Sequence, residues 1–295
     1  MHRLVGGDAA RDPHHDVHVS ILPQPAPARA CRIAEGPGTP VPRTSSTPRR
    51  EGPGARGRPR LGRVCTVVID VEAAGSARLL AVRDEDPHRE WDALGPWWPE
   101  QYPGVIGIRD RRAGGAWLAV NPQERRLAVL LNRADVNDLP GPAASRGSLP
   151  LESVSGRSPQ GLPRMHGFNL LEVGPDGARV VSWDGATLRE TPVTPGTHMI
   201  AHDDLDDEQT PRITAWLPEF RALGPAAASA DWVAEWTALL GASAELSPED
   251  DRAIIRDNRP HGYPTQSLLY AVAAVTPAGV EVRDVTLPSP AHWTA

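Results

Sequence analysis

The chain has 295 residues, enough for one large domain or two small ones, and its 31 basic and 37 acidic residues leave a formal charge of −6. This balance argues against nucleic-acid binding as the main function, because phosphate contacts are made by clustered basic side chains. No segment approaches the roughly 20 apolar residues that span a bilayer, and the N-terminus lacks the basic-then-apolar order of a signal peptide. Two cysteines are too few for a disulfide framework, so we expect a soluble, cytoplasmic protein.

Residues 1–64 differ in composition from the rest of the chain. They contain 11 Arg, five acidic residues, ten Pro, eight Gly and no aromatic residue. A segment without large apolar side chains cannot bury enough surface to offset its conformational entropy. We therefore predict a disordered Pro-, Gly- and Arg-rich extension at 1–64, followed by a domain at 65–295. Since the extension carries +6, the domain carries −12.

Strand patterns begin directly after the extension. The apolar, β-branched run at 64–71 and the run at 78–84 flank a Gly-Ser turn and predict a hairpin. The runs at 104–110, 116–120 and 126–132 are predicted to form an antiparallel meander. The runs at 168–173 and 178–183 predict a second hairpin, and a single strand is predicted at 196–201.

Helical patterns are concentrated between residues 209 and 257. The clearest covers 229–241, where apolar residues recur at helical spacing and Gly241 is a C-cap signal. Another helix is predicted to begin at Ser247, with Pro248 at its first position. A final hairpin, 267–275 with 280–285, places strands at both ends of the domain. This order predicts an α+β domain whose terminal strands share a sheet.

The common catalytic motifs are absent from the sequence: it has no Walker loop, strand-linked GxGxxG, GxSxG, HExxH or CxxC. The acidic run 202–208 lacks the Gly and terminal Glu of a calcium loop and is better explained as a solvated loop. Cys65 is either a small buried hydrophobic residue or a nucleophile. In the second case the predicted hairpin returns Arg83 and Asp84 to its side, where a guanidinium favours the thiolate.

At these residues the sequence resembles the NRDE family, also called the transport and Golgi organization 2 homologues. The resemblance extends from Cys65 to Trp293. It rests on the number and order of several short motifs and not on any single one. The motifs are Cys65-Thr66, Val82-Arg83-Asp84-Glu85, Gly107-Ile108-Arg109-Asp110, Gly114-Gly115-Ala116-Trp117-Leu118-Ala119-Val120, Leu130-Leu131-Asn132, Ser145-Arg146-Gly147, Gly167-Phe168-Asn169-Leu170-Leu171 and Thr194-Pro195-Gly196-Thr197.

The resemblance implies a four-layer αββα sandwich of the N-terminal-nucleophile type, similar to penicillin V acylase and bile-salt hydrolase. In such enzymes the first residue is Cys, and its free α-amine is the base for its own thiol. By position, Cys65 is the implied nucleophile, Arg83 lies beside the thiolate, Asp84 is the acid near the amine, and Asn132 donates to the oxyanion.

Three departures from the family pattern accompany this resemblance. Val82 replaces the Asn of the Asn-Arg-Asp-Glu box. His202 stands where family members often carry Asn, and Gln266 where they carry Arg. One oxyanion donor and one arginine that faces the substrate or thiol are therefore missing from the expected set.

The implied mechanism also requires Cys65 to be the first residue, although it is internal in the sequence. Residues 1–64 are either a propeptide or the result of a misassigned start, because a GTG codon encodes Val64 internally and can also initiate as a removable Met. All 31 basic residues are Arg and none is Lys, which is typical of a GC-rich gene. We favour the misassigned start.

Two functions of different class follow. The first is a cysteine amidohydrolase that cleaves a linear C–N amide bond in a small molecule and needs no cofactor or metal. The second is a non-enzymatic binding or trafficking protein on the same fold, with haem or a haem-like ligand as its cargo. His166, His198 and His202 could ligate the iron, but a loop or packing role is the simpler explanation for each.

Overall fold

The computed structural model describes residues 19–21, 65–137, 139 and 141–293. Thirteen strands form two sheets, and three α-helices lie outside them. The strands are β1 (Val19–Ile21), β2 (Thr66–Val71), β3 (Ala77–Glu85), β4 (Trp91–Gly95), β5 (Ile106–Asp110), β6 (Ala116–Asn121), β7 (Arg126–Asn132), β8 (Phe168–Gly174), β9 (Gly177–Trp183), β10 (Leu188–Val193), β11 (Gly196–Ile200), β12 (Gln266–Thr276) and β13 (Gly279–Thr286). The helices are α1 (Ser148–Val154), α2 (Pro211–Ala222) and α3 (Trp232–Ser243).

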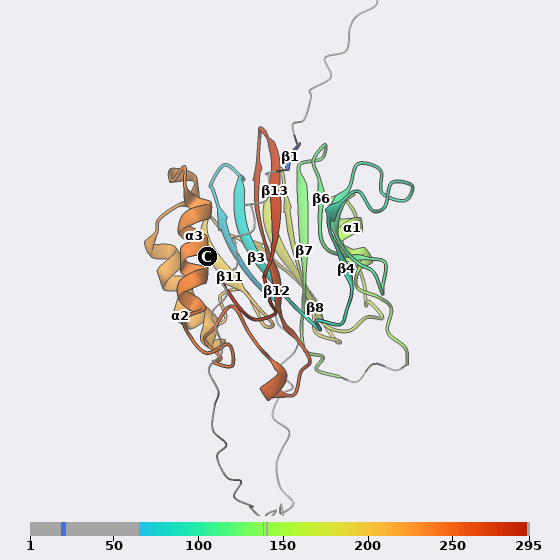
Figure 1. The fold of residues 1–295 in the computed structure, drawn as a ribbon. Helices are drawn as coiled ribbons and strands as arrows, with labels where there is room; N and C mark the ends of the chain where they lie inside the picture. The colour runs from blue at the N-terminus through green and yellow to red at the C-terminus, as the bar shows by residue number, and fades with distance from the viewer. Residues whose placement is uncertain (1–18, 22–64, 138, 140, 294–295) are drawn as a thin grey trace, which may run out of the picture.

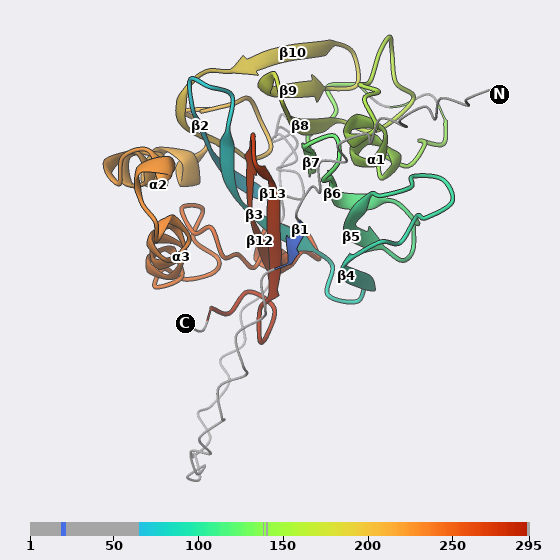
Figure 2. The same cartoon turned by 90° about the horizontal axis from the view of Figure 1, so that it is seen from above.

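The two sheets are built from different parts of the chain. The seven-stranded sheet is a continuous antiparallel meander from β4 to β10. The six-stranded sheet has the order β1-β13-β12-β3-β2-β11, and all its pairs are antiparallel except that of β1 with β13. Figures 1 and 2 show the sheets face to face, with α2 and α3 outside the six-stranded sheet and α1 outside the other.

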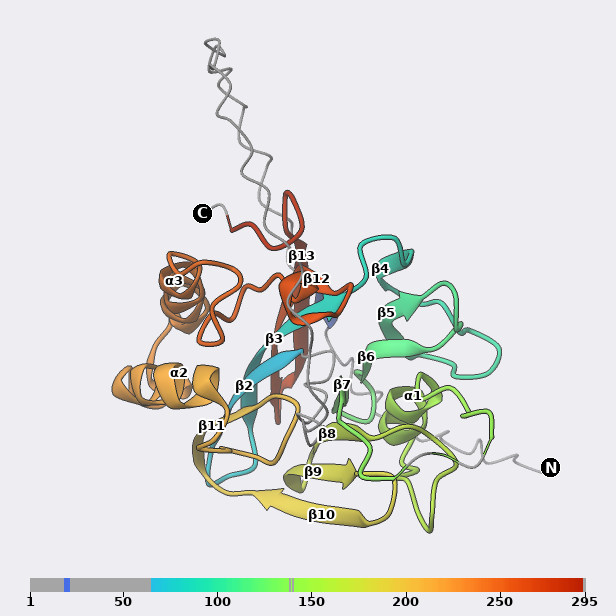
Figure 3. The same ribbon diagram turned by 90° about the horizontal axis from the view of Figure 1, so that it is seen from below.

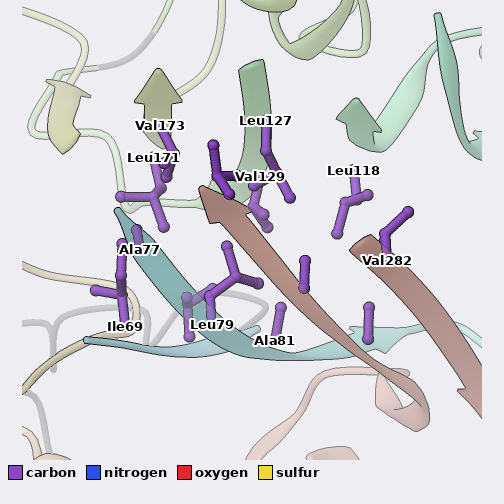
Figure 4. Close-up of a cluster of buried hydrophobic side chains, with 14 of the residues drawn as sticks. Ile69, Ala77, Leu79, Ala81, Leu118, Leu127, Val129, Leu171, Val173 and Val282 are labelled. Carbon is purple, nitrogen blue, oxygen red and sulfur yellow. The ribbon is translucent and has the colours of Figure 1, made fainter. Parts of the chain in front are cut away.

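The central strands of each sheet, such as β2, β6, β8 and β12, are buried on both faces, which explains the continuous apolar runs in the sequence. Along β2, Val67 and Ile69 point into the space between the sheets, whereas Val68 packs toward α2 and α3. On the other sheet, Leu127 and Val129 face the same space from β7 (Figure 4), and Ala128 packs toward α1. Successive side chains of a strand therefore point to opposite faces of its sheet and fill three apolar layers: one between the sheets, one beneath α2 and α3, and one beneath α1.

The predicted α+β class is confirmed, and so are the two hairpins that bring the ends of the domain into one sheet, since β3 pairs with both β2 and β12. The sequence analysis did not predict β4, β10 or α1. The predicted disordered extension, 1–64, lies outside the described residues except for β1, which the prediction did not include.

The helix predicted to begin at Ser247 is wrong, because this segment forms a series of turns. Its backbone N–H groups are bound by side chains from other elements: Ser243 Oγ accepts from Ile254 and Ser267 Oγ accepts from Arg256. Ile254 is completely buried. Tertiary contacts therefore replace the helical hydrogen bonds that the local capping pattern favours.

Gly241 does not end its helix, which continues to Ser243. A Cβ at this position would lie 2.9 Å from Trp293 Nε1. The glycine is explained by the close approach of the C-terminal tryptophan and not by a C-cap.

None of the helices within the described ranges is long and apolar enough to span a bilayer.

Candidate active site

Cys65 lies one residue before β2, at the end of the six-stranded sheet where β3 finishes. Thr66 is paired with Val82 across the hairpin, so the antiparallel register brings Cys65 beside Arg83. The Cys65 thiol lies 3.9 Å from the carbonyl oxygen of Asp84. The hairpin thus returns the two charged residues to the cysteine, as the sequence predicts.

A pocket of about 590 Å³ opens beside this cysteine, between the two sheets. Its walls include Cys65, Arg83 and Asp84 from the six-stranded sheet and Asn132 from the end of β7. In Figure 3 the strands β2 and β3 lie opposite β6 and β7. All four residues that the sequence analysis selected therefore line one pocket, although they come from both sheets.

Burial holds the Cys65 thiol in its protonated form while the residue is internal. It raises the pKa of the thiol to about 12, and the negative charge of Asp84 adds to the effect. The hydrogen bond to the backbone of Asp84 and the positive charge of Arg83 act in the opposite direction but do not outweigh it. A thiol in this state is a poor nucleophile, so reactivity at Cys65 requires a base within contact distance.

Arg83 is a buried cation at the wall of the pocket, with only 3% of its side chain exposed. Its Nη2 lies 3.7 Å from both Glu85 and Asp110, and burial lowers the pKa of the guanidinium. Asp110 also binds Arg89. The two carboxylates and two arginines form a balanced cluster, but Arg83 Nη1 has no hydrogen-bond partner within the described part of the chain.

Asp84 is held from the side of the sheet opposite to the pocket. Ser267 Oγ donates to Asp84 Oδ1 over 2.6 Å, and Asn258 Nδ2 lies 3.5 Å from Oδ2. Burial raises the pKa of this carboxyl to about 6, against the lowering effect of Arg212 and of the two hydrogen bonds. Sequence reasoning missed these supporting residues, because they lie more than 120 positions along the chain and carry no local motif.

Asn132 ends β7 and is half-buried at the pocket. Within the part of the chain that the structure describes, its side-chain amide makes no hydrogen bond, so Nδ2–H is available to a ligand oxygen. The backbone of Asn132 pairs with Phe168 in the sheet, which fixes its position.

Two glycines bring a second loop to the pocket. A Cβ on Gly115 would lie 2.4 Å from the carbonyl carbon of Gly147, and Ala116 N donates to Gly147 O over 2.8 Å. This contact places Arg146 at the pocket, where its Nη1 donates to the carbonyl of Gly167. The glycines of two separate sequence motifs are thus explained by one backbone contact.

His202 and Gln266 do not line the Cys65 pocket. Gln266 donates to Asp257 over 3.1 Å. His202 faces a separate cavity of about 230 Å³ together with Arg212 and Arg256, and its Nδ1 is buried without a partner. The two departures from the family pattern therefore lie outside this pocket.

The other candidate histidines differ in access. Both ring nitrogens of His198 are engaged, Nδ1 with Asp206 and Nε2 with the carbonyl of Thr194. His166 lies at the Cys65 pocket, and its Nδ1 is 2.6 Å from Asp135. Across the described ranges, no group of three or more His, Cys, Asp or Glu side chains could hold a metal ion.

A comparison with known protein families identifies the family of the chain. The sequence model of the family Transport and Golgi organisation 2 matches residues 64–254, almost two thirds of the chain. The chain belongs to this family. No curated protein matches the sequence.

The match to the Transport and Golgi organisation 2 family begins one residue before Cys65 and includes the residues that line the pocket. It ends before β12, which supplies Ser267. The family region therefore contains the predicted site residues, while part of the support for Asp84 comes from beyond it.

Proposed function

We propose that this chain is a cysteine amidohydrolase of the N-terminal-nucleophile type, which cleaves a linear C–N amide bond in a small molecule. The observation that carries the proposal is the shared pocket of Cys65, Arg83, Asp84 and Asn132. Three groups of the required chemistry, drawn from both sheets, accompany the nucleophilic thiol: a cation, an acid and an amide donor.

The order of layers supports the same reading. Helices α2 and α3, the six-stranded sheet, the seven-stranded sheet and α1 follow one another across the molecule. An αββα sandwich with the cysteine at the start of a strand between the sheets is the arrangement expected of an N-terminal-nucleophile enzyme. Fold alone does not determine activity, so the proposal depends on the pocket.

The proposed reaction requires Cys65 to be the first residue, either after removal of a propeptide or after initiation at Val64. Its α-amine then takes the proton from Sγ, and the thiolate attacks the carbonyl carbon of the amide. Arg83 stabilises the thiolate, and Asp84 holds the resulting ammonium group. Asn132 Nδ2–H donates to the oxyanion of the tetrahedral intermediate.

The second half of the reaction releases both products. The ammonium group donates its proton to the amide nitrogen, and the C–N bond breaks. The product amine departs, and the acyl group remains bound to Cys65 as a thioester. Water, deprotonated by the same amine, attacks the thioester, and its S–C bond breaks to release a carboxylic acid. The sum is one amide and one water converted into one acid and one amine.

The first experiment is intact mass and N-terminal sequencing of the protein expressed from its native gene with the upstream region included. We expect the mature chain to begin at Cys65. Incubation with a panel of activated amides should then add an acyl mass to the wild-type chain but not to Cys65→Ala. Asn132→Ala should lower kcat by about 10²–10³-fold, the usual cost of one oxyanion donor.

A chain that retains Met1 with Cys65 internal contradicts the mechanism, because an amide nitrogen cannot act as the base. The same conclusion holds if the chain begins at Cys65 and no amide acylates it. Either result would favour a protein that binds its ligand without cleaving it, and haem titration followed by absorbance would then test that function.

A further inference from the structure

Two buried N–H donors at the Cys65 pocket have no acceptor among the residues that the structure describes. Trp117 lies on β6 with 6% of its surface exposed, and its Nε1 is one of these donors. Arg83 Nη1, on the opposite sheet, is the other. Both residues line the same pocket. A buried donor without an acceptor costs free energy, so two such donors at one pocket favour a bound molecule that accepts from them.

Other tryptophans show that this arrangement is not general in the molecule. Trp183 Nε1 donates to the carbonyl of Met165 over 2.9 Å, and Trp98 Nε1 donates to the carbonyl of Gly114 over 2.7 Å. Both of these rings are also buried. The unpaired indole N–H of Trp117 is therefore a feature of the pocket, since Trp98 and Trp183 are also buried but have hydrogen-bond partners.

The acidic groups of the pocket already have partners among its own side chains. Glu85 and Asp110 lie against Arg83 Nη2 and Arg89. Asp84 accepts from Ser267. An oxygen atom of a bound molecule that enters between the pocket side chains would supply the acceptor that the two donors lack.

Arg112 adds positive charge at the mouth of the pocket. It is exposed, and its side chain makes neither a hydrogen bond nor an ion pair with any residue in the described ranges. Its neighbour Arg111 differs, because it binds Asp92 over 2.6 Å and lies outside the Cys65 pocket. In a domain with a net charge of −12, an unpaired cation at this position favours an anionic ligand.

From these observations we infer that the pocket recognises a carboxylate-bearing amide. Trp117 Nε1–H and Arg83 Nη1–H donate to the carbonyl oxygen of the amide, and Arg112 pairs with the carboxylate at the mouth. This inference rests on the proposed function for the position of the scissile bond at Cys65, but recognition itself does not require the thiol. Trp117 then binds the amide, and Arg112 determines the preference for a carboxylate.

The first test compares the same substitution at two buried tryptophans by thermal unfolding. Trp183→Phe removes a hydrogen bond and leaves the carbonyl of Met165 unpaired, so we expect its Tm to fall by several degrees. Trp117→Phe makes the same reduction in ring size but breaks no hydrogen bond to a described residue, so its Tm should fall clearly less than that of Trp183→Phe. An equal fall of Tm in both variants would show that the Trp117 N–H is structural and would overturn the inference.

The second test measures ligand affinity by calorimetry in the Cys65→Ala protein, which cannot turn over. The probes are N-octanoylglycine and N-octanoylglycinamide, which share the amide bond and differ in the carboxylate. We expect the carboxylate ligand to bind about three- to tenfold more tightly. Arg112→Gln should remove that difference, whereas Arg111→Gln should keep it.

Trp117→Phe should weaken both ligands by a similar factor, about three- to tenfold, because both contain the amide oxygen. Equal affinity of the two probes, or no binding of either, would overturn the inference. Because the protein used has no thiol at position 65, its result is independent of acyl trapping. Binding without hydrolysis would contradict only the proposed function, and hydrolysis of neutral amides alone would contradict only the inferred specificity.

Discussion

The space between the two sheets has an apolar region and a charged region, and β3 passes through both. The apolar region contains Leu79 on β3 and Leu127 on β7, both buried to 1% exposure or less (Figure 4). The charged region begins four residues further along β3, where Arg83, Asp84 and Glu85 are buried nearly as deeply. The side chains of β3 thus change from apolar to charged along the strand while they remain buried.

This difference separates what stabilises the domain from what the pocket can do. Burying apolar side chains is favourable in itself, whereas a buried charge costs free energy unless it is paired and hydrogen-bonded. The charged region contains one cation with an unpaired nitrogen and one carboxyl whose pKa is raised to about 6. Such groups are expected at a functional site, since burial and close charges are the means by which proteins adjust reactivity.

Cys65 lies at the border of the two regions, and its reactivity is the most sensitive test of the comparison. With Cys65 internal, the raised thiol pKa of about 12 should slow alkylation by iodoacetamide at pH 7.5 by roughly a thousandfold relative to the urea-unfolded chain. Intact mass over time measures this in a Cys31→Ser background. A chain that begins at Cys65 should react much faster, because its α-amine accepts the thiol proton.

Labelling of the folded internal form at the rate of the unfolded form would show that burial does not control the thiol. Protection in both folded forms would show that the α-amine is not positioned to act as a base.

The next largest effect is expected in the apolar region. Leu127→Ala removes a fully buried side chain from the layer between the sheets, and we expect the free energy of unfolding to fall by about 3–5 kcal/mol in urea titrations. The alkylation rate of folded Cys65 should not change, since none of the charged groups moves. Faster labelling in this variant would mean that the two regions are not independent.

The sequence predicted the apolar region well, because burial on both faces leaves continuous apolar runs with clear turns between them. It also predicted the meeting of Cys65 with Arg83 and Asp84, since hairpin register follows from the lengths of two adjacent strands. The resemblance to the family added Asn132, which comes from the other sheet.

Other features depend on contacts that local patterns do not encode. Ser247 and Pro248 read as a helix start, yet the backbone there is bound by serines of α3 and β12. Ser267 and Asn258 reach Asp84 from positions 183 and 174 residues away. Nothing in the sequence marks the N–H of Trp117 as unpaired, because the pairing of a side chain is a property of the folded packing.

The smallest predicted effect concerns Asp84, whose pKa is about 6 in the fold against an ordinary value of 3.8. Because the folded-state pKa is the higher one, the protonated carboxyl stabilises the fold fully below about pH 4, and this contribution is lost as pH rises through 6. The loss is on the order of 3 kcal/mol for the internal form. Urea titrations from pH 4 to 8 should show this slope in the wild-type chain and not in Asp84→Asn.

A second buried aspartate provides the control for this slope. Asp70 accepts hydrogen bonds from Thr197 Oγ1 and from the backbone of Ala226, so Asp70→Asn should lower stability and shows what the loss of a buried, hydrogen-bonded carboxylate does by itself. An identical slope in the wild-type chain and in Asp84→Asn would place the titration elsewhere. In a chain that begins at Cys65, the new ammonium group favours the charged carboxylate, so the slope should shrink there. The size of that reduction measures how closely the α-amine and Asp84 interact, which the proposed mechanism requires.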